Sequence, residues 1–181
     1  MSGSVHLAIA VLGPDRPGLV DAVSEFLFDC EANIEESRMT VLGAEFSVML
    51  LIQGSETTAA RVESDLPAFA EKNDLCVIVQ RTAAPSARAV PGSLAYRLTA
   101  TSLDHPGIVN RISHVLAQQG VNIERAECGA RPGPWSGSPV FHLEMTLAIA
   151  KQAQTAALRD ALAALGSDEG IDIELRAVPT Q

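Results

Sequence analysis

The chain has 181 residues, 47% of them hydrophobic and 4% aromatic, which is enough for one ordinary domain or two small ones. Its formal net charge of -9 repels the phosphate backbone, so we expect no direct nucleic-acid binding. No stretch approaches the roughly 20 apolar residues of a membrane helix, and the N-terminus lacks the basic start of a signal sequence, so we expect a cytoplasmic protein without a membrane segment. The three cysteines form no CxxC pair, so we expect reduced thiols and no metal site. We also expect no cofactor.

A duplication organises the chain. The segment DRPGLVDAVSEFLFDCEANIE (15–35) aligns without a gap with DHPGIVNRISHVLAQQGVNIE (104–124), with 9 identities in 21 positions, where average residue usage would give about one or two. Between the repeats lies TAAPSARAVPGS (82–93), which is small, polar and carries two prolines, as is typical of a linker. We predict a first domain over 1–82, a linker over 83–92 and a second domain over 93–181.

The first repeat begins with an apolar extended run, VHLAIAVL (5–12), followed by a helical stripe at residues 19, 20, 23, 26 and 27. IEESRMTVLGAEFSVMLLI (34–52) reads as two strands that turn near Gly43. A second helical stripe contains Val62, Leu66 and Phe69, and Pro67 is expected to kink or shorten that helix. LCVIVQR (75–81) closes the unit as a strand.

The second repeat follows the same order, with strands at 94–103, 121–130, 140–150 and 171–178 and helices at 106–119 and through Leu158, Leu162 and Leu165. A longer connection, RPGPWSGSP (131–139), separates its middle strands and carries Trp135. The βαββαβ order predicts an α+β fold of two ferredoxin-like units in tandem, each an antiparallel sheet with its helices on one face. Met49 and Leu51 make the first unit's sheet apolar on both faces, so we expect it to be covered in a homo-oligomer or by the sister repeat.

Each repeat places a D-x-P-G string between its first strand and first helix. Pro17 and Pro106 suit a first helical turn, and Asp15 and Asp104 are expected to cap it. These strings are followed at equal spacing by Asn-Ile, at 33–34 and 122–123. An Asn there has two explanations, a ligand contact or a left-handed residue that ends the helix.

Catalytic residues are not predicted. The four histidines are scattered, without an HExxH, GxSxG or phosphate-loop motif, and His114 is expected to be solvated. Cys30 lies near the end of a helix, where the dipole does not activate a thiol, so we expect a buried structural cysteine. The chain is therefore expected not to be an enzyme.

The strings LGPDRPGLV and NIEESRMTVLGAEFSVMLL, with their echoes DHPGIV and NIE, resemble the ACT domain, a small ligand-sensing regulatory module. The resemblance covers nearly the whole chain as a tandem pair, and the first unit is most similar to the glycine cleavage system transcriptional repressor family. It implies that an amino acid or a similar small ligand binds between paired ACT units. The positions implied as ligand contacts are Gly13, Asp15, Arg16, Gly18, Asn33, Ile34, Asp104, His105, Gly107, Asn122 and Ile123.

Two functions follow from this resemblance. In the first, an amino acid changes how the units pack and thereby alters affinity for a protein partner, which the resemblance makes a transcriptional activator. In the alternative, the protein is a ligand-free interaction scaffold. If only one unit binds, the first is favoured, because Gly13 allows a ligand to approach the backbone.

Overall fold

The computed structural model describes residues 4–84, 94–133, 137–150 and 152–178, which belong to two compact units, Met1–Ala89 and Val90–Gln181. The linker predicted over 83–92 and the loop residue Trp135 lie largely or wholly outside the described residues. None of the helices in the described part of the chain combines the length and apolar character needed to cross a membrane.

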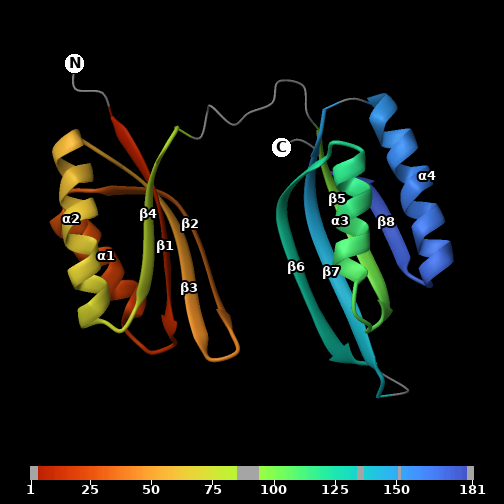
Figure 1. Cartoon of the computed structure of the whole chain (residues 1–181), viewed down its shortest axis with the longest axis horizontal. Coiled ribbons are helices and arrows are strands. Elements are labelled where there is room, and N and C mark those ends of the chain that lie inside the picture. Colours follow the sequence, from red (N-terminus) through yellow and green to blue (C-terminus); the bar gives the residue numbers. More distant parts are fainter. Residues whose placement is uncertain (1–3, 85–93, 134–136, 151, 179–181) are drawn as a thin grey trace. The chain divides into compact units, whose positions relative to one another are not determined.

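The first unit is a four-stranded antiparallel sheet with both helices on one face (Figure 1). The strand order β2-β3-β1-β4 places β2 at one edge and β4 at the other. The predicted βαββαβ order is confirmed, and its elements are β1 (Val5–Pro14), α1 (Leu19–Asp29), β2 (Asn33–Leu42), β3 (Glu45–Gly54), α2 (Glu56–Lys72) and β4 (Cys76–Thr82).

The core of this unit consists of alternate apolar residues of the strands and of the apolar residues on one face of each helix. Alternate β1 residues point to the helices, and α1 buries Leu19, Val23 and Leu27 at four-residue spacing. Val20, counted in the predicted stripe, is 48% exposed, because the next helical residue points about 100° away from Leu19. Helix α2 continues through Pro67 to Lys72, so the predicted shortening is wrong.

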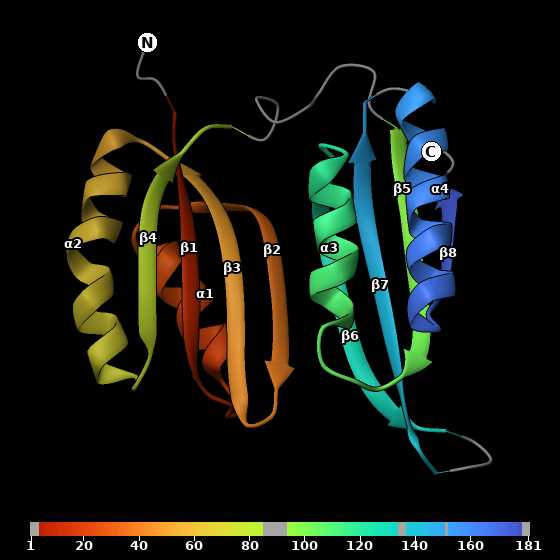
Figure 2. The same ribbon diagram turned by 45° about the vertical axis from the view of Figure 1, so that its right-hand side comes forward.

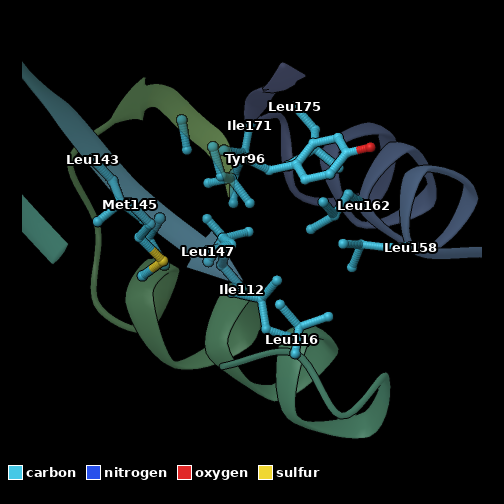
Figure 3. Packing of buried hydrophobic residues seen from close by; sticks show 14 of the residues in the cluster. Tyr96, Ile112, Leu116, Leu143, Met145, Leu147, Leu158, Leu162, Ile171 and Leu175 are labelled. Carbon is cyan, nitrogen blue, oxygen red and sulfur yellow. The ribbon is translucent and has the colours of Figure 1, made fainter. Parts of the chain in front are cut away.

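The second unit repeats the arrangement, with strand order β6-β7-β5-β8 and both helices on one face of its sheet (Figure 2). Its core is buried between the sheet and the helices, where Ile112 and Leu116 of the first helix and Leu158 and Leu162 of the second belong to one buried cluster with Leu147 (Figure 3). Its elements are β5 (Leu94–Leu103), α3 (Ile108–Gln118), β6 (Asn122–Pro132), β7 (Pro139–Ile149), α4 (Gln152–Glu169) and β8 (Asp172–Ala177).

Candidate functional site

Both predicted ligand loops begin their helix at a glycine. Gly18 (φ 91°) and Gly107 (φ 101°) are the N-cap residues of α1 and α3 and lie in the left-handed region. The expectation that Asp15 and Asp104 cap these helices is wrong, because neither helix has a side-chain cap among the described residues. The prolines also precede the N-cap instead of opening the first turn, since the left-handed glycine reverses the chain just before the helix. Backbone N–H groups of both first turns therefore remain available to an anionic ligand.

A backbone hydrogen bond connects each of these loops to the hairpin formed by the two middle strands of its own unit. The Asp15 amide donates to the Ala44 carbonyl oxygen at 2.9 Å, and the Asp104 amide donates to the Pro139 carbonyl oxygen at 3.0 Å. Both aspartates are exposed, and neither carboxylate forms a hydrogen bond or ion pair with the described residues. The backbone thus positions the two loops, while the carboxylates are free to contact a cationic group.

In the first unit, the loop also packs on the turn between α2 and β4. A Cβ on Gly13 would lie 2.8 Å from the Asp74 carbonyl oxygen and 2.7 Å from Leu75 Cδ2. The turn at Asp74 and Leu75 therefore fills the space beside Gly13. The expectation that a ligand approaches the backbone at Gly13 is wrong for this reason. Arg16 donates from Nη2 to the Asn73 carbonyl oxygen at 2.6 Å, at the C-terminus of α2, where a cation is favoured by the helix dipole.

The second loop has different side chains at these positions. Ser102 replaces Gly13; it is buried, and its Oγ donates to the Leu103 carbonyl oxygen at 3.0 Å. His105 replaces Arg16 and is half-buried, with Nδ1 3.2 Å from the Pro106 carbonyl oxygen. A guanidinium lies near this helix start instead: Arg111, which is ion-paired with Glu169.

The Asn-Ile positions open the second strand of each unit. The left-handed residues that end α1 and α3 are Glu31 (φ 60°) and Gly120 (φ 64°), so helix termination does not explain Asn33 or Asn122. Both asparagines are exposed, and their side chains make no hydrogen bond with the described residues. A register shift follows the isoleucine in both repeats, as bulges commonly do where a strand must re-aim its side chains.

An open hollow of about 570 Å³ runs along α1 to the start of β2. Asn33, Ile34 and the highly exposed Phe28 line it, and Asp21 and Glu25 add carboxylates from the helix. An amide, an apolar wall and negative charge can together hold the amino group and the carbon skeleton of a small zwitterion.

The structure does not bring all predicted residues of one unit together. The loop of Gly13, Asp15, Arg16 and Gly18 lies at the start of α1, whereas Asn33 lies beyond its end. An 11-residue helix is roughly 16 Å long at 1.5 Å per residue. The second unit has the same separation, with Asp104, His105 and Gly107 before α3 and Asn122 and Ile123 after it.

Sequence reasoning missed one polar pair at the Asn33 end of the sheet. His6 of β1 is 8% exposed, and its Nε2 lies 3.3 Å from Oε2 of Glu35, the residue skipped by the register shift in β2. The position of His6 is taken by Ala95 in the second repeat, so the pair belongs to the first unit alone. The repeated NIE motif singled out Glu35, but only the strand register identifies its partner.

The cysteines and histidines show no further cluster. Cys30 is buried as predicted, and burial raises the pKa of its thiol. His114 is exposed, as expected, and its Nε2 lies 2.9 Å from Nε2 of Gln118. Within the described ranges, no three His, Cys, Asp or Glu side chains are grouped so that they could hold a metal ion.

Comparisons with known proteins match both units. Family models described as "ACT domain" match residues 6–80 and residues 96–166. The glycine cleavage system transcriptional repressor of Escherichia coli is 28% identical over 165 residues, which cover 91% of this chain and 86% of that protein.

Two solved structures extend over both units. A protein of unknown function from Galdieria sulphuraria has a TM-score of 0.81 and 27% identity, covering 98% of this chain and 100% of that chain. A provisionally assigned glycine cleavage system transcriptional repressor has a TM-score of 0.71 and 23% identity, covering 99% of this chain and 100% of that chain, which supports the fold alone.

Proposed function

This chain belongs to the ACT-domain family, as two ACT domains in tandem, and from this premise we propose that it is a non-catalytic sensor of an amino acid or similar metabolite. A regulatory function agrees with its similarity to the Escherichia coli repressor. The proposal also covers the class of ligand, the site where it binds and the partner protein that responds to it.

The observation that carries the proposal is the repeated pair of unpartnered groups. Each unit offers an uncapped helix start with free backbone amides, and each offers a free asparagine at the far end of the same helix. Amides at a helix N-terminus suit an α-carboxylate, and asparagine can both donate to and accept from a small polar ligand.

The two kinds of group in one unit are too far apart for one amino acid to reach both. A free amino acid is shorter than the roughly 16 Å that separates Gly18 from Asn33 along α1. A single ligand therefore contacts either the helix start or the asparagine of a given unit. Binding regulates a partner when the ligand favours one of two conformations of the protein, and this differential affinity is what would couple ligand to partner.

The proposed partner is a transcriptional activator protein in the cytoplasm, by analogy with the repressor that the chain resembles. The net charge of -9 disfavours direct contact with DNA, so regulation would act through protein contacts. The purified protein alone is expected to give no specific gel shift at physiological salt.

The test is a thermal-shift panel of amino acids and related metabolites on the full chain. A ligand that binds only the folded protein raises the melting temperature by mass action. We expect one ligand class to stabilise the wild type and to lose its effect in Asn33→Ala or Asn122→Ala. The matched control is Gln80→Ala, an exposed amide side chain on β4 outside both helix starts, which should retain the full shift.

A flat panel, with the variants folded by circular dichroism, would contradict ligand sensing and leave the ligand-free scaffold as the function. A ligand-induced rise in melting temperature that persists in both Asn33→Ala and Asn122→Ala would contradict the assignment of the two asparagines as ligand contacts. A specific gel shift by the protein alone would contradict regulation through a protein partner.

A further inference from the structure

The two sheets carry opposite chemistry on the faces that their helices leave open. In the first unit, cross-strand register defines three central rows on this face, and we call these twelve residues the open face of unit 1. The rows are Gln80–Ala8–Leu51–Glu36, Ile78–Ala10–Met49–Arg38 and Cys76–Leu12–Ser47–Thr40. Leu12, Met49 and Ile78 are 48%, 61% and 66% exposed, so large apolar side chains of β1, β3 and β4 face outward from this sheet.

The second unit has charged or polar residues at all of the same register positions except Gly129. Its rows are Arg176–Arg97–Thr146–Arg125, Glu174–Thr99–Glu144–Glu127 and Asp172–Thr101–His142–Gly129. Arg97 pairs with Glu144 at 3.3 Å, Arg176 pairs with Glu174 at 2.6 Å, and Arg125 pairs with Glu127. The neighbouring Glu127 holds the pKa of Arg125 above its ordinary value. These charges are already paired on a solvated surface.

This contrast determines which surface can cover the open face of unit 1. A charged sheet laid on it would lose hydration without gaining partners for its charges, which opposes a dry contact. The open face of unit 1 carries two charged side chains in its central rows, and these are opposite in sign and paired with each other, Arg38 with Glu36 at 2.6 Å. Two copies of this face therefore bring apolar surface together without net charge repulsion.

The shape of the face also suits its own copy. Ala8 and Ala10 make a low furrow along β1, and Met49 of β3 and Ile78 of β4 rise on either side of Ala10. Ridges of one copy can enter the furrow of the other when sheets pack about 10 Å apart. Four strands about 4.8 Å apart and three rows about 6.8 Å apart give a face of roughly 400 Å². Two such faces total about 800 Å², which is the size of a weak contact, so dimerisation should depend strongly on protein concentration.

We propose that the open face of unit 1 is a self-association surface, on which the same face of a second copy of this chain packs in an isologous dimer. The contact needs no ligand, and it lies on the sheet face opposite to the helices. Its twelve residues include none of the ligand positions proposed at the two ends of α1 and α3, and Asn33 lies in the neighbouring row with His6 and Gln53.

The test is sedimentation velocity of the ligand-free full chain over a wide range of concentration, for the wild type and for Met49→Glu and Ile78→Glu. The second repeat carries Glu144 and Glu174 at these register positions, so glutamate is compatible with this sheet. We expect the wild type to dimerise and each variant to raise the dimer dissociation constant at least about 100-fold, because it buries two unpaired carboxylates per dimer.

Leu103→Glu is the matched control, because Leu103 is 66% exposed like Ile78 but lies in the second unit. It should dimerise like the wild type. A second readout uses the exposed thiols: alkylation of Cys76, on the proposed face, should slow as concentration rises, while that of Cys128, in the second unit, should not.

A wild-type chain that stays monomeric overturns the proposal, and so does a dimer that survives Met49→Glu and Ile78→Glu in proteins folded by circular dichroism. Protection of Cys76 in a monomer also overturns it, since that result would mean that another part of the same chain covers the face. The sedimentation and alkylation experiments are done without ligand, so their outcomes do not depend on whether the protein shows a ligand-induced thermal shift.

Discussion

Gly13→Ala tests how tightly the first loop is packed on the turn between α2 and β4. The new methyl group would lie 2.8 Å from the Asp74 carbonyl oxygen and 2.7 Å from Leu75 Cδ2, whereas ordinary contacts begin near 3.4 Å. The Asp74 carbonyl belongs to the backbone, so the turn must move by about half an ångström, and overpacking of this kind costs about 1–3 kcal/mol. For a unit of this size, the melting temperature of the first repeat should fall by roughly 4–24 °C.

The two repeats can be followed separately, because the single Tyr and the single Trp both belong to the second repeat. Far-UV circular dichroism reports both units, whereas fluorescence excited at these residues reports the second. Gly13→Ala should lower the dichroism transition and leave the fluorescence transition in place. The matched variant is Ser102→Ala, at the equivalent position, which loses one hydrogen bond worth about 1 kcal/mol and should affect the fluorescence transition. An unchanged dichroism transition for Gly13→Ala would refute the tight packing of this loop.

Two further predictions concern titratable groups in the first unit. Hydrogen bonds from Arg81 hold the pKa of Glu63 below its ordinary value, so this pair stabilises the fold above about pH 4.5 and loses that effect as pH falls through the lower, folded-state pKa. Melting temperatures measured between neutral and acidic pH should therefore fall more for the wild type than for Glu63→Gln, and parallel curves would contradict the pairing. Burial raises the pKa of Cys30 and shields its thiol, so iodoacetamide should modify Cys76 and Cys128 in the folded protein and Cys30 only after unfolding, as read by peptide mass spectrometry. Rapid modification of native Cys30 would show that the end of α1 opens easily.

Local patterns predicted the elements well because their causes are local. Alternating apolar residues produce β1, the four-residue spacing of Leu19, Val23 and Leu27 produces α1, and Gly43 with φ 66° makes the hairpin turn. Predictions about helix ends were less reliable. Aspartate is a good cap in general, but Gly18 and Gly107 take the N-cap position in this fold.

By itself, the sequence determined the duplication, the βαββαβ order and the candidate residues, since these depend on composition, spacing and periodicity over short stretches of chain. The tertiary structure decided what those residues touch. It placed Gly13 and Arg16 against a turn some 60 residues away, put Asn33 at the far end of α1 from the loop, and brought His6 to Glu35. It also set the register that aligns Met49 with the position of Glu144 in the sister sheet. Contacts between distant segments depend on strand pairing and helix packing, and a one-residue change of register would turn every one of these side chains to the other face.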